Sequence, residues 1–322
     1  MERAQAWLRR YGRPLEAALW DFHFDAGSKE EVIRCLSAFQ NGDGGFGHGL
    51  EPDFWLPQSS PMASWMAGRI LLDIDADPQE PIVQRLIHYL LTTEQVRPGM
   101  WPSVLPENNA YPHAPWWHWS PEAQDGWMYN PSVELAAMLI HWSGSQGSAA
   151  ELGWASLRPA VGYLMQADHI DWHGLKNYWQ SLRLLQPFQD RFRAEVGYAW
   201  AVVEQKVKKL ILAVVDRDVP SWERDYKPLP LDFVQGPACP LCPDLKPLVE
   251  DNLRFFLQSR TDWGIWDILW EWGQYPQEFA VARRYWQGIL AVERYKILRA
   301  FNWLAAGICA DGRSAGSKGA GS

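Results

Sequence analysis

The sequence predicts an all-α fold, and three observations carry this prediction. Amphipathic helical segments recur along the chain, and several end at a glutamine that an aromatic residue follows six positions later. No alternation of apolar and polar residues, the pattern of a half-buried strand, extends beyond a few residues. The 23 prolines and 25 glycines gather between the helical segments. Together these features favour helices joined by loops.

Two junctions at helix ends share one spacing, with a glycine four residues after the glutamine and an aromatic residue two positions later. They are Gln40, Gly44 and Phe46 after a helix expected from Glu30 to Phe39, and Gln95, Gly99 and Trp101 after one expected from Pro81 to Thr93. Glycine permits the positive φ of a tight reversal, glutamine can hydrogen-bond open backbone groups, and the aromatic ring covers the turn. Each junction therefore predicts the end of a helix.

Two looser copies follow, and a second helix is expected after each junction. The looser copies are Gln166 and Trp172 after a helix from Trp154 to Met165, with Ile170 in the glycine position, and Gln258 with Trp263-Gly264-Ile265-Trp266 after a helix from Leu245 to Leu257. The second helices are expected at Met62–Leu72, Ser132–Trp142, Leu182–Leu185 and Ile268–Trp272. Ser60-Pro61 and Asn130-Pro131 are start signals for the first two. The repeating unit is helix, capped loop, helix.

Tryptophan is unusually frequent, with 21 Trp in 322 residues and 14% aromatic residues overall. The remaining composition, 47% hydrophobic and 21% charged, is typical of a globular protein. An indole has a large apolar face and a polar N–H, which suits hydrophobic or cationic ligands and the flat faces of sugars. The indoles therefore indicate either a lined cavity or the repeated use of Trp in helix packing.

Charge and hydropathy argue against two classes of partner. The net charge is −8, and no stretch interleaves basic with aromatic residues, so nucleic acid is not an expected partner. The sequence contains no apolar run long enough for an integral membrane segment and no signal-like N-terminus, and its four cysteines do not form a disulfide framework. We expect a cytoplasmic protein with a single domain over residues 1–310 and a flexible Gly/Ser-rich tail over 311–322.

The segments from Gln40 to Phe46 and from Gln95 to Trp101 resemble the Gln-x-x-x-Gly-x-Trp/Phe repeats of squalene cyclase and other terpenoid cyclases. Protein prenyltransferase subunits share the fold of that family. The resemblance implies an (α/α) toroid of inner and outer helices. It also implies a cavity for a small apolar substrate, an isoprenoid, with aromatic faces that stabilise carbocations.

The catalytic motifs of these families are not matched. The closest segment to the Asp-x-Asp-Asp acid motif is Asp73-Ile-Asp75-Ala-Asp77, whose fourth residue is Ala76 and which is expected to form a loop. There is no Asp-Asp-x-x-Asp motif for a magnesium–diphosphate site. Cys239 and Cys242 form a lone Cys-x-x-Cys without the second ligand pair of a structural zinc site. We therefore expect no metal and no cofactor.

The densest group of candidate catalytic residues lies in the glycine-rich loop that leads into the helix at Met62. It contains His48, Glu51, Asp53 and Trp55. Glu51 or Asp53 is a candidate general acid or base with His48 as its partner, and Trp55 is a candidate pocket residue. The alternative is structural, with His48 bracing the loop and Glu51 capping a helix.

A second group surrounds the start of the helix at Ser132. Trp127, Tyr129 and Asn130, which precede it, are candidate substrate-binding residues, and Glu134 lies one turn into an otherwise apolar helix. A carboxylate at the mouth of an apolar inner helix suits a proton donor in a cavity, whereas a first-turn Glu is also common as a helix-stabilising residue. Glu134 therefore joins Glu51, Asp53 and His48 as a candidate catalytic residue.

The fourth copy adds Trp266, Asp267, Trp270 and Glu271 as candidate substrate-binding residues. On the expected helix Asp267 and Glu271 are four residues apart and share one face between tryptophans. Paired carboxylates between aromatic rings also suit a sugar-cleaving site. This pattern keeps a carbohydrate-active toroid, a hydrolase or lyase, as an alternative.

The favoured hypothesis is a terpenoid-cyclase-like enzyme that acts on an isoprenoid by acid–base chemistry in a Trp-lined cavity. Glu51, Asp53 or Glu134 would donate the proton. Besides the carbohydrate-active alternative, a non-catalytic module that binds an apolar ligand or a peptide stays open, because the acid motif is absent. The sequence does not determine the oligomeric state.

Overall fold

The computed structural model describes residues 1–144 and 146–304. Within these residues the secondary structure is helical, with isolated β-bridges but no strands. The all-α class predicted from the sequence is confirmed. The tail expected over 311–322, and Cys309, lie outside the described residues.

The helices follow the chain with loops of uneven length between them. The α-helices are α1 Glu2–Tyr11, α2 Pro14–Phe24, α3 Lys29–Ser37, α4 Pro61–Asp73, α5 Pro81–Thr92, α6 Ala123–Trp127, α7 Ser132–Trp142, α8 Gly147–Gln166, α9 Trp172–Leu185, α10 Gln189–Val196, α11 Trp200–Val214, α12 Pro230–Phe233, α13 Cys242–Gln258 and α14 Pro276–Ala300. Short 3-10 helices are η1 Pro106–Ala110, η2 Pro115–Trp117, η3 Gln186–Phe188 and η4 Val219–Ser221.

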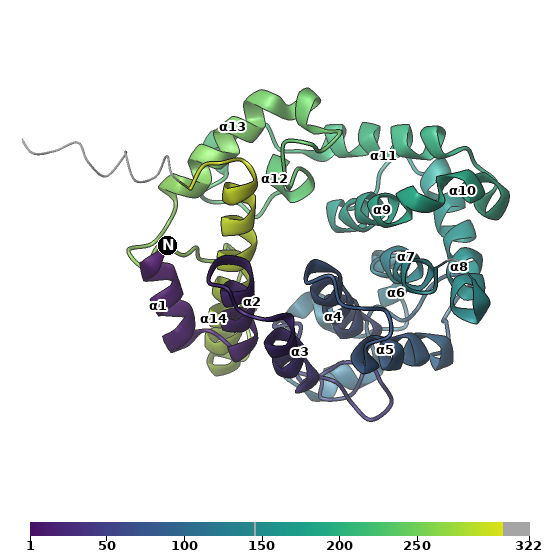
Figure 1. Ribbon diagram of the computed structural model, residues 1–322, viewed down its shortest axis with the longest axis horizontal. Helices are drawn as coiled ribbons and strands as arrows, with labels where there is room; N and C mark the ends of the chain where they lie inside the picture. Colours follow the sequence, from purple (N-terminus) through teal and green to yellow (C-terminus); the bar gives the residue numbers. More distant parts are fainter. Residues whose placement is uncertain (145, 305–322) are drawn as a thin grey trace, which may run out of the picture.

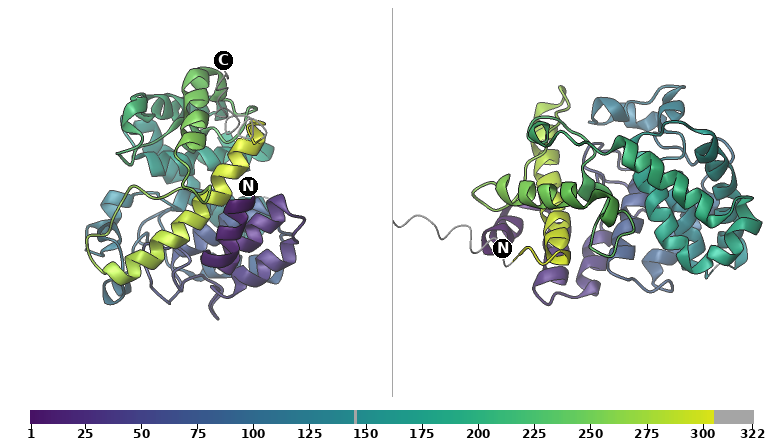
Figure 2. Two further views of the ribbon diagram at one scale, coloured as in Figure 1. Left: turned by 90° about the vertical axis from the view of Figure 1, so that its left-hand side faces the viewer. Right: turned by 90° about the horizontal axis from the view of Figure 1, so that it is seen from above.

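The helices are arranged around a central space, as Figure 1 shows. Helix α4 packs against α7, α7 against α9, α9 against α12, and α14 against α2. Farther from the centre, α5, α8, α11 and α13 pack against α4, α7, α9 and α12. Figure 2 shows α14 crossing one side of the molecule beside α1 and α2. Segments from both ends of the chain thus lie side by side.

Helix α7 is the most deeply buried element. Every residue from Ser132 to Ile140 is buried, because α4, α8 and α9 all pack against this helix. Glu134 is the acidic member of this run and is 2% exposed. A carboxyl group in such a place needs specific polar partners, because burial of an unpaired charge is strongly unfavourable.

The second glutamine junction ties three helices together. The Gln95 side chain accepts a hydrogen bond from the Gly99 N–H at 2.9 Å and donates one to the Ser156 hydroxyl of α8 at 2.7 Å. The Trp101 indole donates to the Leu90 carbonyl of α5 at 3.1 Å, and its backbone N–H donates to the Ser132 hydroxyl at 3.0 Å. The motif therefore links helices in addition to ending one.

The first junction works in a related way. The Gln40 amide donates to the Gly44 carbonyl at 2.9 Å and to the Ile82 carbonyl of α5 at 3.0 Å. The Phe46 backbone N–H donates to the Ser64 hydroxyl of α4 at 3.0 Å, as that of Trp101 does to Ser132. Both junctions thus connect one helix pair to the next.

The later copies depart from the expected pattern. In the fourth copy Gly264 has a φ of +75° and the Trp266 indole donates to the Phe256 carbonyl at 2.8 Å, as expected for a ring that covers the turn. In the third copy Trp172 begins α9 and lines the central cavity instead. The helix expected over Leu182–Leu185 is the last turn of α9, which begins ten residues earlier.

The prediction of a helix over Ile268–Trp272 is wrong, because this segment is an irregular loop. The indole N–H groups of Trp270 and Trp272 both donate to the Asp53 carboxylate, at 3.1 and 3.0 Å. Residues two apart point in different directions on a helix but in the same direction along an extended chain. The shared partner therefore requires a non-helical backbone.

Charged side chains also join α2 and α14 to α4. Asp73, at the end of α4, accepts a hydrogen bond from Lys296 of α14 and lies 2.8 Å from the His23 ring of α2. Burial opposes ionisation of Asp73, but its contacts with His23 and Lys296 outweigh burial and lower its pKa to about 2. In the part of the chain that the structure describes, no helix has the length and apolar character needed to cross a membrane.

The Gly99 turn provides a direct test of the second junction. Gly99 has a φ of +79°, and a Cβ there would lie 2.5 Å from the Ser156 carbonyl oxygen. We expect Gly99→Ala to lower the free energy of unfolding by about 2 kcal/mol, measured by urea denaturation. Gly126→Ala is the matched control, because a Cβ there meets nothing within 4 Å. Equal effects of the two substitutions would contradict this role of the junction.

Candidate active site

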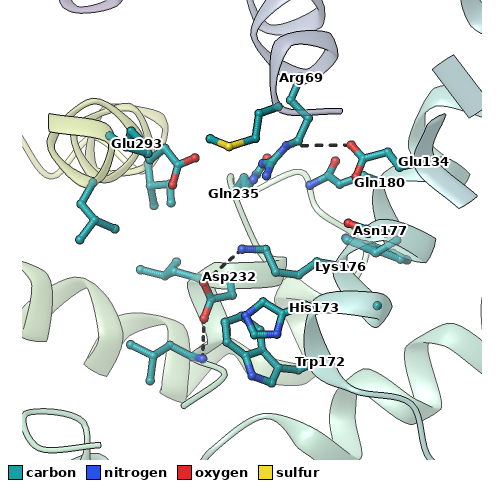
Figure 3. A pocket seen from close by; sticks show the side chains of 18 of the residues that line it. Arg69, Glu134, Trp172, His173, Lys176, Asn177, Gln180, Asp232, Gln235 and Glu293 are labelled. Carbon is teal, nitrogen blue, oxygen red and sulfur yellow. Dashed lines mark hydrogen bonds and ion pairs between the residues drawn. The ribbon is translucent and has the colours of Figure 1, made fainter. Parts of the chain in front are cut away.

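A cavity of about 2030 Å³ occupies the central space between the helices. Helices α2, α4, α7, α9, α12 and α14 contribute to its lining, together with the loops before α4, α7 and α14. Figure 3 shows side chains from several of these helices converging on one part of it. Residues far apart in the sequence therefore meet here.

The lining combines indole rings with charged and amide groups. The tryptophans are Trp65, Trp116, Trp117, Trp127, Trp172, Trp179, Trp200, Trp222, Trp266, Trp270 and Trp286. Polar lining residues around the part drawn in Figure 3 are Arg69, Glu134, His173, Lys176, Asn177, Gln180, Asp232, Gln235 and Glu293. The cavity can therefore offer both flat apolar faces and hydrogen-bonding groups to one ligand.

Most residues singled out in the sequence line this cavity. They are Glu51, Asp53, Trp127, Tyr129, Asn130, Glu134, Trp266, Asp267 and Trp270. They come from the loops before α4, α7 and α14, from the end of α6 and from α7 itself. The folded chain thus brings together the three groups that the sequence analysis treated separately.

His48 and Trp55 lie outside the lining. His48 is exposed, and its Nε2 lies 2.8 Å from the side-chain oxygen of Asn41. The Trp55 indole donates to the Pro52 carbonyl at 3.1 Å, and its ring packs over Gly49. Both side chains brace the loop, so the expected pairing of His48 with Glu51 or Asp53 is wrong.

Asp53 accepts hydrogen bonds from three indoles. Its Oδ1 accepts from Trp272 at 3.0 Å and from Trp286 at 2.8 Å, and its Oδ2 accepts from Trp270 at 3.1 Å. The side chain is buried, 3% exposed. Because Trp270 and Trp286 line the cavity, Asp53 fixes the orientation of part of its aromatic wall.

Two opposing effects act on the ionisation of Asp53. Burial disfavours the charged form, whereas the indole hydrogen bonds favour it, and burial prevails. The pKa of the Asp53 carboxyl is raised to about 6. Both oxygens already accept protein hydrogen bonds, so this carboxylate is better suited to holding the wall than to donating a proton.

Glu51 braces the same loop from within. Its Oε2 accepts a hydrogen bond from the Asp53 N–H at 2.7 Å. Burial raises the pKa of the Glu51 carboxyl well above its usual range, and the neighbouring Asp53 charge raises it further. Arg13, in a buried ion pair with Glu16, donates to the carbonyls of Gly49 and Leu50 and fixes the preceding turn.

Glu134 projects from the first turn of α7 toward the cavity (Figure 3). Its Oε2 accepts a hydrogen bond from the Trp65 indole at 2.8 Å, and its Oε1 lies 3.9 Å from the Arg69 guanidinium. Burial raises the pKa of the Glu134 carboxyl, although Arg69, Trp65 and Lys176 favour its charged form. A raised pKa suits a group that gives up a proton near neutral pH.

The residues before α7 line the cavity beside Glu134. Asn130 accepts a hydrogen bond from the Asn177 amide of α9 at 2.6 Å, so this amide pair joins the segment before α7 to α9. Tyr129 packs against Tyr163 with ring centroids 5.6 Å apart. Trp127 stacks on Trp117 of η2, with ring centroids 4.4 Å apart and an interplanar angle of 12°, and both rings line the cavity.

Asp267 and Glu271 do not form the expected pair. With no helix at this point, Glu271 is exposed and outside the cavity lining. Asp267 forms an ion pair with Arg283 of α14 and accepts a hydrogen bond from Gln287 at 3.0 Å. Burial opposes ionisation of Asp267, but the Arg283 hydrogen bond and its other partners lower its pKa. This carboxylate anchors the loop to α14.

Most of the polar side chains that line the cavity were not predicted from the sequence. Arg69 lies on α4, Glu293 on α14, and His173, Lys176, Asn177 and Gln180 recur at helical spacing on α9. The opposite side of α9 carries Leu175, Tyr178 and Leu182, which are buried. A polar stripe opposite an apolar one normally indicates the solvent side of a helix. The sequence offered this signal, but only the fold turns the stripe toward a cavity.

Within residues 1–144 and 146–304, no group of three or more His, Cys, Asp or Glu side chains is placed to hold a metal ion. Cys239 and Cys242 are free thiols. The Cys239 Sγ lies 3.6 Å from the Phe233 carbonyl oxygen, and burial raises the pKa of its thiol.

The three indoles on Asp53 give a spectroscopic test of this carboxylate. We expect the Nε1–H resonances of Trp270, Trp272 and Trp286 to shift together with a midpoint near pH 6, the pKa of Asp53. Because this pKa lies above the unfolded value of about 3.9, the contribution of Asp53 to stability is greatest below pH 4 and is lost as the pH rises through 6. Nitrogen–proton NMR of Trp-labelled protein measures the shifts.

The Trp101 indole, which donates to a backbone carbonyl, is the internal control and should not titrate with this midpoint. Asp53→Asn should abolish the common titration. Independent midpoints for the three indoles, or their persistence in Asp53→Asn, would contradict the shared hydrogen bonding.

We compared the chain with family models, with curated proteins and with solved structures, and none of them matches it.

Proposed function

We propose that this chain is a carbohydrate-active enzyme that binds an oligosaccharide in the central cavity and uses Glu134 as its proton donor. The observation that carries the proposal is a buried carboxyl group with a raised pKa in a cavity lined by both indoles and polar side chains. An alternative role for the cavity would have to explain both features.

The mixed lining favours a sugar over a hydrocarbon. A sugar ring has apolar C–H faces that stack on aromatic rings, and its rim of hydroxyl groups needs hydrogen-bonding partners. Arg69, Lys176, Gln180 and Asp232 supply such partners in the part of the cavity shown in Figure 3. An isoprenoid in the same place would displace the water that hydrogen-bonds to these groups. It would offer no hydrogen bonds in return, which is unfavourable.

A series of neighbouring aromatic rings extends along one wall of the cavity. Trp172 lies 5.3 Å from Tyr226, Tyr226 lies 4.8 Å from Trp270, and Trp270 lies 5.4 Å from Trp286, between ring centroids. All four residues line the cavity. A wall of this kind suits an extended ligand with several flat units, as an oligosaccharide has.

In the proposed reaction Glu134 gives its proton to the glycosidic oxygen as the bond from that oxygen to the anomeric carbon breaks. A water molecule forms the new bond to the anomeric carbon, and a carboxylate takes up the proton that the water releases. Asp232 and Glu293 face the same space as Glu134 and are candidates for this base (Figure 3). Trp65 holds the Glu134 carboxyl in place for the transfer.

The terpenoid-cyclase-like function stays a prediction from the family resemblance, as does its double-ring toroid. The same Glu134 would serve there as the initiating acid, but the charged lining makes an isoprenoid the less favoured ligand. A cytoplasmic location and a non-catalytic binding role also stay predictions. The following experiment separates the three functions.

We expect the protein to cleave at least one member of a panel of oligosaccharides and none of a matched panel of linear isoprenoids, with products detected by mass spectrometry. Glu134→Gln should lower kcat by roughly 10²- to 10⁴-fold, because it removes the proton donor. In the wild type kcat should fall as the pH rises through the raised pKa of Glu134, because the acid must be protonated.

Glu151→Gln, at an exposed position of α8, is the matched control and should leave kcat unchanged. Glu51→Gln tests the other buried acid and should affect stability more than kcat, because Glu51 braces a loop. Turnover of an isoprenoid, wild-type kcat in Glu134→Gln, or saccharide binding without turnover would each contradict the proposed function.

A further inference from the structure

Among the cations that line the cavity, Arg69 and Lys176 each lie over a tryptophan and are labelled in the part drawn in Figure 3. Arg69 projects from α4 with its guanidinium 5.2 Å from the Trp65 ring centre, and Lys176 projects from α9 with its ammonium 5.5 Å from that of Trp172. Figure 3 shows both side chains pointing into the same part of the cavity. The indoles position the charges without occupying their hydrogen-bond donors.

Arg69 keeps its donors available. Its only ion-pair contact within the described residues is to Glu134 at 3.9 Å, which is too long for a hydrogen bond, and no hydrogen bond to another described residue satisfies its N–H groups. The side chain is 29% exposed, into the cavity. By contrast, the buried Arg13 makes a 2.6 Å contact with Glu16. The contact with Trp65 thus holds Arg69 in place while its N–H groups stay available to a ligand.

Lys176 is also loosely paired. Its ammonium lies 3.5 Å from the Asp232 Oδ1, and Asp232 directs its other oxygen to the Leu229 backbone N–H at 2.7 Å. Asp232 is therefore partly committed to the start of α12. An incoming anion can approach Lys176 without having to break a tight ion pair.

The acid nearest to Arg69 is Glu134, which lies 3.9 Å from the guanidinium, beyond hydrogen-bond distance. Burial raises the pKa of the Glu134 carboxyl. Asp232 and Glu293 are the other acids drawn around this space, and Gln180 and Gln235 are neutral donors and acceptors beside them. Arg69 and Lys176 are the cations labelled in this part of the cavity, so an anion would be placed between them.

We propose that Arg69 and Lys176 form a subsite for the carboxylate of an acidic sugar, so that the ligand of the cavity is a uronic-acid oligosaccharide. The inference rests on the proposed function and makes its substrate class specific. A guanidinium presents paired N–H donors that match the two oxygens of a carboxylate, and the ammonium adds a second positive charge. The neighbouring indoles would carry the sugar rings.

The subsite would also assist the proton donor. Arg69, Trp65 and Lys176 are the groups that favour the charged form of Glu134. When a ligand carboxylate pairs with Arg69, the Arg69 charge favours the ionised form of Glu134 less strongly. Glu134 would then keep its proton until the transfer to the ligand. Binding and chemistry would then be coupled through one arginine.

Calorimetric titration with uronic-acid trisaccharides and their methyl esters tests this inference. The esters keep the shape of each sugar but remove its charge. We expect at least one acid to bind about tenfold or more tightly than its ester. Arg69→Gln should weaken binding of that acid about tenfold while changing the ester less than about twofold, and added salt should weaken the acid alone.

Arg254→Gln, an exposed arginine of α13 outside the cavity, is the matched control and should bind both ligands as the wild type does. Lys176→Met provides a second, independent variant with the same expected direction, and the thermal midpoint of each variant verifies its folding. Sulfated trisaccharides of the same length distinguish a carboxylate subsite from a general oxyanion site.

Equal affinity for acids and esters, equal losses for both ligands in Arg69→Gln, or tighter binding of the sulfated sugars would overturn the carboxylate subsite. If neutral trisaccharides bind and acidic ones do not bind better, the subsite fails while the carbohydrate-active function stands. If no saccharide binds, the proposed function and the subsite fail together.

Discussion

The carboxylate of Asp53 joins an early and a late segment of the chain beside the cavity. It lies in the loop before α4 and accepts hydrogen bonds from Trp270, Trp272 and Trp286, more than two hundred residues later in the sequence. Hydrogen bonds to a charged acceptor are stronger than those between neutral groups, and a low-dielectric site strengthens them further. The loop before α14, the first turns of α14 and the glycine-rich loop are thereby held in one arrangement.

The glutamine junctions extend the same principle around the molecule. Gln40 and Gln95 each complete a turn at a helix end and also bond to a group on a neighbouring helix. The aromatic residue that follows donates its backbone N–H to a serine hydroxyl, Ser64 of α4 after the first junction and Ser132 of α7 after the second. Each unit therefore fixes the placement of its neighbour through these hydrogen bonds.

Burial gives the cavity its chemical character. Glu51, Asp53 and Glu134 all have raised pKa values because burial disfavours their charged forms, but their partners differ. Backbone N–H groups hold Glu51 and indoles hold Asp53, whereas Glu134 has one indole partner and a distant cation. Similar residues thus have different surroundings. Glu51 and Asp53 brace the loop and wall of the cavity, whereas Glu134 is the residue that we propose as the proton donor, beside the loosely paired Arg69.

The sequence alone determined the all-α class, the junctions at Gln40 and Gln95, and helix α7 to the residue, because local periodicity and capping signals act within a few residues. It also singled out the carboxyl groups of Glu51, Asp53 and Glu134, which line the cavity. Only the tertiary structure decided that Trp270 and Trp272 share Asp53, which replaces the expected helix with a loop. It likewise turned the polar side of α9 toward a cavity. Contacts across such long sequence separations leave no local periodicity from which to predict them.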